Sequence, residues 1–175
     1  ARVRFSPKKT MSVAQGLYEG VEIGDKGPIG LITYMRTDST RVAQEAQTAA
    51  RELIVSEYGE KYCPEKAPVY ASKKRTQDAH EAIRPTYFDL SPATIKKYLS
   101  PDQLKLYTLI WNRFLASQMA PAEIERTSVE INAKSTDPKT KKNVDYTLKT
   151  GAEKVVFLGF LKIYEDVAEE NGNGK

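Results

Sequence analysis

SPDQLKLYTLIWNRFLASQ, residues 100–118, predicts the helix around which this chain builds its core. Ser100 and Gln103 have the spacing of a capping box, and Pro101 between them suits the first helical position. Apolar side chains then recur at three- and four-residue steps along one side of the helix: Leu104, Tyr107, Trp111, Phe114 and Leu115. This pattern is typical of an amphipathic helix whose apolar side packs inward, and Pro121 stops it.

Capping and breaking residues predict further helices upstream of this one. Ser6 can cap a helix whose first residue is Pro7, and Gly20 can end it. Gly59 closes a second helix that is rich in Ala, Gln and Glu. A short helix is expected inside a long polar stretch, and another starts at Ser91. The helices expected upstream of residue 100 therefore span residues 7–19, about 40–58, 78–83 and a few residues from 91.

Strand-forming residues dominate after Pro121. Three strands are expected, separated by turns at Asp137-Pro138 and at Gly151. They span residues 123–132, 144–150 and 153–164. The sequence therefore predicts an α+β fold, with a mainly helical domain at 1–120 and antiparallel β strands with an unpacked, acidic tail at 121–175.

Composition narrows the classes of protein to consider. The chain has 175 residues, which is enough for one principal core. Its net charge of +4 indicates a mild preference for an anionic partner. Its one cysteine, Cys63, cannot form an internal disulfide, which fits a reducing, cytoplasmic setting. The longest apolar stretch, 155–164, is far short of the roughly 20 residues that span a bilayer, so no membrane segment is expected. The basic start without methionine and the glycine-rich end suggest a piece of a longer protein.

The stretch GLITYMRTDS, residues 30–39, carries the most distinctive chemistry. A short strand at 31–36 would put Ile32, Tyr34 and Arg36 on one face, with Thr33 and Met35 on the other. Thr37, Asp38 and Ser39 would then lead into a helix start, which favours an anion. A phosphodiester suits this combination, because a phenol oxygen can attack phosphorus while a guanidinium holds its oxygens. The same residues are also compatible with an ordinary strand aromatic and an ordinary helix cap.

Four segments resemble one enzyme family in the same order along the chain. GLITYMRTDST is similar to the active-site segment of type IA DNA topoisomerases, in the form that the bacterial topoisomerase I branch uses. The other three are FSPKKTMSVAQGLYEG, YASKKRTQDAHEAIRPT and LYTLIWNRFLASQMAPA, so that the resemblance covers most of residues 4–122. The strands at 123–165 match only loosely.

The resemblance implies roles for particular residues. Tyr34 aligns with the nucleophile that cleaves one DNA strand and becomes joined to its 5′ phosphate, and Arg36 aligns with a DNA-contacting arginine of the active site. The other residues implied to contact DNA or to shape the site are Thr33, Thr37, Asp38, His80 and Arg84. For His80 the plain alternative is a histidine satisfied by the backbone, and the basic loop Lys73, Lys74 and Arg75 either steers DNA or is simply solvated.

The resemblance also implies parts that this chain does not contain. The family binds Mg²⁺ through an acidic cluster in an N-terminal Toprim domain, which also supplies a lysine and a glutamate, whereas this chain has no Asp-x-Asp signature. The strand-binding domain and the first half of the β-rich arch are likewise expected elsewhere in the parent protein. The arch and the tyrosine domain would move apart as a gate that lets a second strand pass. Because the phosphotyrosine linkage conserves the energy of the broken phosphodiester, resealing would need no ATP, in accord with the lack of a P-loop sequence.

Three hypotheses follow for function. The first is a fragment of a type IA DNA topoisomerase that is folded but inactive by itself and binds single-stranded DNA weakly. The second is a noncatalytic helical module that binds single-stranded DNA, with Tyr34 structural. The third is a tyrosine recombinase fragment, which the position of Tyr34 near the start of the chain disfavours, since those enzymes carry their tyrosine near the C-terminus.

Overall fold

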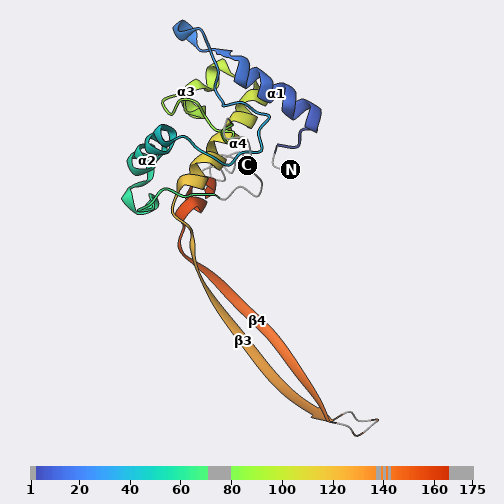
Figure 1. The fold of residues 1–175 in the computed structure, drawn as a ribbon. Helices are drawn as coiled ribbons and strands as arrows, with labels where there is room; N and C mark the ends of the chain where they lie inside the picture. Colours follow the sequence, from blue (N-terminus) through green and yellow to red (C-terminus); the bar gives the residue numbers. More distant parts are fainter. Residues whose placement is uncertain (1–2, 71–79, 137–138, 140, 142, 166–175) are drawn as a thin grey trace. The chain divides into compact units, whose positions relative to one another are not determined.

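The computed structural model of the chain describes residues 3–70, 80–136, 139, 141 and 143–165. It divides into two compact units, one formed by residues 1–120 with 160–175 and the other by residues 121–159. The first unit carries the helices and the second carries a long β hairpin (Figure 1). The predicted α+β class is confirmed. Residues 160–165 join the helical unit, so the β unit ends earlier than the predicted 121–175.

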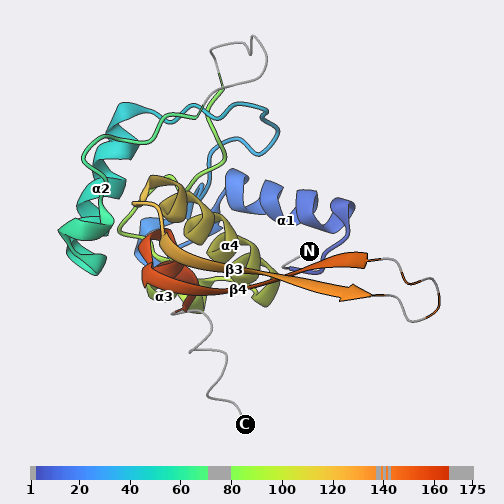
Figure 2. The same ribbon diagram turned by 90° about the horizontal axis from the view of Figure 1, so that it is seen from below.

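Helix α4, Pro101–Gln118, lies at the centre of the helical unit and contacts α1, Pro7–Glu19, α2, Gln44–Tyr58, and α3, Pro92–Ile95 (Figure 2). The predicted capping box is present, with Ser100 and Gln103 bonded to each other's backbone N–H. Its inward side chains are buried: Leu106, Tyr107, Trp111, Phe114, Leu115 and Gln118. Apolar periodicity thus identified four of the buried side chains correctly, whereas Leu104, also predicted to face inward, is only half-buried.

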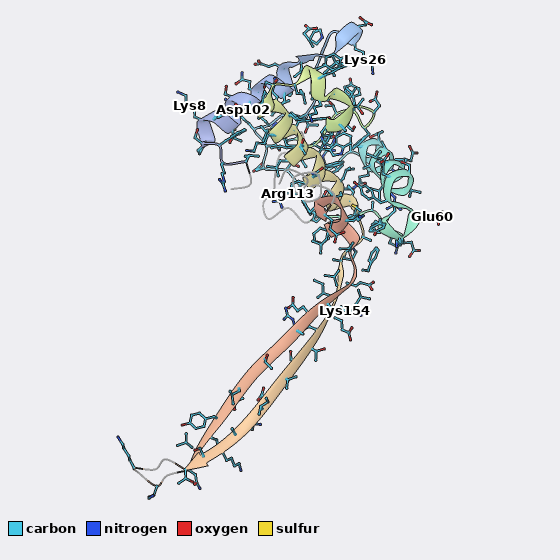
Figure 3. The ribbon with its side chains drawn as sticks, turned by 180° about the vertical axis from the view of Figure 1, so that it is seen from behind. Lys8, Lys26, Glu60, Asp102, Arg113 and Lys154 are labelled. Atoms are coloured by element: carbon cyan, nitrogen blue, oxygen red, sulfur yellow. The ribbon has the colours of Figure 1, made fainter. Side chains whose placement is uncertain are left out.

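Helix α1 also begins and ends where its sequence predicts. The Ser6 hydroxyl accepts a hydrogen bond from the Lys9 N–H, and Gly20 follows the last turn with φ of +138°, a backbone conformation that glycine tolerates best. Leu17 is fully buried. The helix is further joined to α4 by an ion pair of Lys9 with Asp102. Figure 3 labels Asp102. Beyond α1, strands β1, Val21–Glu22, and β2, Pro28–Ile29, form a small antiparallel hairpin around the 3-10 turn Gly24–Lys26.

Two helix predictions need correction. Helix α2 begins at Gln44 rather than near residue 40, and its N-cap, Ala43, makes no side-chain cap bond. The helix expected at 78–83 is not formed at residues 80–83, while 78 and 79 lie outside the described residues. The remaining short elements are α3, which the sequence predicted at Ser91, and 3-10 turns at Glu60–Tyr62, Lys96–Tyr98 and Gly159–Leu161. No helix in the described parts of the chain is long and apolar enough to cross a membrane.

The β unit is a single antiparallel pair of strands, β3, Glu123–Thr136, and β4, Asn143–Phe157 (Figure 1). The predicted turn at Gly151 is wrong, because Gly151 lies within β4 opposite Ser128. A Cβ at that position would approach the Thr127 carbonyl oxygen to 2.8 Å, so glycine here permits close strand pairing. Residues 158–164, predicted as strand, are not strand.

The two faces of the hairpin differ in chemistry. Side chains project from the ribbon along its length, Lys154 among them (Figure 3). One face carries the ion pairs of Arg126 with Glu153 and of Glu130 with Lys149. The opposite face carries the exposed apolar side chains Val129, Ile131, Tyr146 and Leu148, while on the ion-paired face Ile124 and Val155 are also exposed.

Candidate active site

The segment that carries Tyr34 is an ordered loop rather than the predicted strand. Its only β pairing in the described part of the chain is an isolated bridge between Ile32 and Pro85. The Leu31 N–H donates to the Leu17 carbonyl of α1 over 2.7 Å, and the Thr86 N–H donates to the Leu31 carbonyl over 3.1 Å. The loop is therefore held on one side by a helix end and on the other by residues 82–86, so no second strand forms beside it.

Close backbone approach fixes the start of the loop. A Cβ on Gly30 would lie 2.7 Å from the Tyr18 carbonyl oxygen, which excludes any larger residue without a backbone shift. The Thr86 hydroxyl donates to the Gly30 carbonyl. Leu31 and Ile32 are buried immediately afterwards. The backbone that leads to Tyr34 is thus anchored in the core.

Thr33 joins this loop to the segment that contains His80 and Arg84. Its hydroxyl donates to the Ala82 carbonyl over 2.8 Å and accepts from the Arg84 N–H over 3.0 Å. Its own N–H donates to the Arg84 carbonyl over 2.9 Å. Thr33 therefore ties together two segments about fifty residues apart, a structural task that supports the tyrosine beside it.

Tyr34 emerges from this anchored backbone with 40% of its surface exposed. Its ring lies 5.4 Å from the ring of Tyr18 in an edge-to-face arrangement, and 6.1 Å from the ring of His80. Its hydroxyl makes no hydrogen bond with any residue that the structure describes. The phenol oxygen is therefore accessible while its ring is held by aromatic neighbours.

Arg36, two residues after Tyr34, is also exposed. Met35 between them is buried, whereas Arg36 is exposed and has no hydrogen bond or ion pair with the described residues. Ile32, predicted to share their face, is buried, so the strand periodicity fails at that residue. The tyrosine and the arginine are nevertheless both exposed to solvent, two residues apart in the chain.

The predicted helix start at residues 37–39 is wrong. The Thr37 hydroxyl accepts a hydrogen bond from the Ser39 N–H over 3.0 Å, and the Ser39 hydroxyl accepts one from the Arg41 N–H over 3.1 Å. Such side-chain turns compete with helical hydrogen bonding and delay the helix to Gln44. Asp38 is exposed between them. A helix N-terminus is therefore not part of the site.

Arg84 is held within the chain. Its guanidinium donates to the Glu81 carboxylate over 2.9 and 2.7 Å and to the Pro85 carbonyl over 3.0 Å, with 13% of its side chain exposed. Sequence reasoning missed Glu81, although its three-residue spacing from Arg84 was a usable signal. It also missed Tyr18, whose ring contact depends on how the loop folds back onto α1. The loop at Lys73, Lys74 and Arg75 lies outside the described residues.

Comparisons with known proteins identify the family of this chain. A family model described as DNA topoisomerase matches residues 1–174. The chain belongs to the DNA topoisomerase family. The match extends across the hairpin, for which the sequence motifs gave only a loose resemblance.

Individual topoisomerases give the degree of similarity. DNA topoisomerase 1 of Campylobacter jejuni is 46% identical over 170 residues, which are 97% of this chain and 23% of that protein. DNA topoisomerase 1 of Helicobacter pylori, strain 26695, is 49% identical over 160 residues, or 91% of this chain and 20% of that protein. The solved structure of full-length topoisomerase I from Thermotoga maritima superposes with a TM-score of 0.72 at 44% identity, covering 91% of this chain and 24% of that one. The chain therefore spans between 20% and 24% of the length of these topoisomerases, and the resemblance to bacterial topoisomerase I is confirmed.

Proposed function

We propose that this chain is the tyrosine-bearing part of a type IA DNA topoisomerase, which relaxes negatively supercoiled DNA by cutting one strand and passing another through the break. The observation that carries the proposal is the placement of Tyr34. Tyr34 is 40% exposed and Arg36, two residues on, is exposed without a partner among the described residues, while Leu31, Ile32 and Met35 are buried. An accessible nucleophile on a firmly anchored backbone is what attack on a phosphodiester needs.

The proposed cleavage step is a transesterification. The Tyr34 phenol oxygen forms a bond to phosphorus as the bond from phosphorus to the 3′ oxygen breaks. The phenol proton passes to a base, and the departing 3′ oxygen takes up a proton to become a hydroxyl. The product is a 5′-phosphotyrosine ester with a free 3′ hydroxyl. Because one phosphoester replaces another, resealing is the reverse reaction and consumes no ATP.

Arg36 is proposed to stabilise the charge that develops on the phosphate. Its planar fork can donate two hydrogen bonds to the nonbridging oxygens. His80 is proposed to contact the bound single strand, since its ring already lies against Tyr34. Thr37 and Asp38 are proposed to line the DNA path. Thr33 and Arg84 are proposed chiefly to stabilise the loop, because the side chains of these two residues are hydrogen-bonded within the chain.

The base and the metal are assigned to other parts of the parent protein. Among the described residues, no three side chains of the His, Cys, Asp or Glu types gather as a metal site. These residues do not fit the Mg²⁺ site of the family, so no step here passes through a metal. We place that site, the proton-transfer groups and the strand-binding domain in the remainder of the parent chain. The chain alone is then expected to be inactive, and action on chromosomal DNA would place the parent in the cytoplasm.

The test compares two single-atom changes in the full-length parent. Tyr34→Phe removes only the phenol oxygen and is expected to abolish relaxation of a negatively supercoiled plasmid. Tyr87→Phe is the matched control, because Tyr87 is 52% exposed in the same unit, and this variant should relax DNA normally. Unchanged relaxation by Tyr34→Phe would exclude the nucleophile and favour the noncatalytic DNA-binding module.

A further inference from the structure

Tyr18 lies in the last turn of α1, outside the motif that carries Tyr34, yet its ring contacts the Tyr34 ring. The ring centroids are 5.4 Å apart and the planes meet at 63°, within the range of a favourable edge-to-face pair. Tyr18 is 42% exposed, and its hydroxyl has no partner among the described residues. The ring, not the hydroxyl, is therefore what Tyr18 presents to its neighbour.

The backbones of both tyrosines are locked to each other. Leu17, beside Tyr18, is fully buried and accepts the hydrogen bond from Leu31. The Tyr18 carbonyl itself lies against Gly30, close enough to exclude a Cβ there. Tyr18 and Tyr34 therefore both lie within a few residues of the contacts that join α1 to the loop. These fixed backbone positions bring the two exposed side chains within contact distance of each other.

Tyr34 needs such a restraint. An exposed tyrosine side chain has several accessible χ1 rotamers, and only a fraction of them would aim its oxygen at a given phosphorus atom. A ring packed edge-on against it removes some of these rotamers at low entropic cost, because tyrosine has few side-chain torsions.

We infer that Tyr18 is a positioning residue, which holds the Tyr34 ring in the rotamer suited to attack on DNA. The inference rests on the proposed function, since it concerns the same nucleophile. Tyr18 acts through Tyr34 and takes no part in bond making. Its contribution belongs to the cleavage step and not to DNA affinity.

The test uses the full-length parent with Tyr18→Ala, Tyr18→Leu and Tyr18→Phe. Alanine removes the ring, leucine keeps apolar bulk without a ring, and phenylalanine keeps the ring without the hydroxyl. Cleavage of an end-labelled single-stranded oligonucleotide is measured in a single turnover at saturating enzyme, and its Kd is measured by fluorescence anisotropy. We expect alanine and leucine to slow cleavage about three- to ten-fold, the size of an aromatic pair, with Kd unchanged. Phenylalanine should cleave like the parent.

Two controls separate this inference from its premises. Tyr87→Ala, an exposed tyrosine without a ring partner in the described chain, should leave the cleavage rate unchanged. Tyr34→Phe should cleave nothing; cleavage by that variant would overturn the proposed function, whereas a normal rate for Tyr18→Leu beside an inactive Tyr34→Phe overturns only the positioning role. A weakened Kd with a normal rate at saturation would instead make Tyr18 a surface on which bases stack, and would also overturn it.

Discussion

Thr33→Val should destabilise the helical unit measurably. Valine has the size and branching of threonine, so packing is kept while the hydroxyl is lost. The change removes the bonds to the Ala82 carbonyl and from the Arg84 N–H, at 2.8 and 3.0 Å. The backbone bond between the Thr33 N–H and the Arg84 carbonyl remains.

The magnitude follows from these two bonds. A hydrogen bond within a protein contributes about 1 kcal/mol net, and a buried group left unpaired costs about 1–3 kcal/mol. Both bonds are only partly buried, so water can replace part of them. We therefore expect the free energy of unfolding to fall by about 2 kcal/mol, or roughly 4–8 °C in melting temperature for a chain of this length.

The assay is thermal and urea unfolding followed by far-ultraviolet circular dichroism. Thr33→Ser, which keeps the hydroxyl, is the control and should lose about half as much or less. Equal stability of the valine variant and the parent would show that Thr33 does not join the tyrosine loop to residues 82–86, and the explanation for the rigidity of the loop would fail.

Three further predictions concern neighbouring residues. Arg36→Ala should slow cleavage by the full-length parent about 10²–10³-fold and Arg36→Lys less, both with unchanged unfolding; early unfolding of the lysine variant would show that Arg36 supports the fold. Glu81→Gln, which breaks a largely buried pair with Arg84, should cost about 1–3 kcal/mol in urea unfolding, whereas Lys26→Gln, which breaks an exposed pair, should cost under about 1 kcal/mol; equal losses would refute the distinction. Burial raises the pKa of Tyr107 above its ordinary value of about 10, so above pH 10 the Tyr107 hydroxyl ionises in the unfolded chain but not in the folded one, and the free energy of unfolding should fall as pH rises. Tyr107→Phe should make the free energy of unfolding fall less steeply with pH in this range; an unchanged pH dependence would contradict the prediction.

The helices that sequence predicts well are those whose signals are local. The capping box at Ser100 and Gln103 and the cap at Ser6 both formed, because each satisfies backbone groups within one turn. The start of α2 was misplaced for a reason that is also local. The hydroxyls of Thr37 and Ser39 accept hydrogen bonds in side-chain turns, and such turns use the same residue types as a helix cap.

Predictions that depended on distant partners failed more often. The loop at 31–36 has strand-forming residues, but its backbone bonds go to Leu17 on one side and to residues 84–86 on the other. Gly151 looked like a turn because a close strand contact leaves no mark in the sequence. The shared exposure of Tyr34 and Arg36 was expected from the two-residue period, although the strand invoked for it is not there.

The partners of the candidate site illustrate the same limit. Tyr18 contacts Tyr34 because Gly30 lets the loop approach the end of α1, a tertiary event that residue spacing does not encode. The pairing of Glu81 with Arg84 was within reach of sequence reasoning, since both lie in one short segment. This ion pair gives Arg84 a structural role in addition to the DNA contact that the motif resemblance implied.

The central claim, that Tyr34 is the nucleophile, is tested most directly by mapping the covalent link. The full-length parent is trapped with a single-stranded oligonucleotide, digested with nuclease and protease, and its peptides are sequenced by mass spectrometry. The account predicts a nucleotide joined through its 5′ phosphate to the tyrosine at position 34, with a free 3′ hydroxyl on the released strand. A link at another tyrosine, or one through a 3′ phosphate, would contradict it.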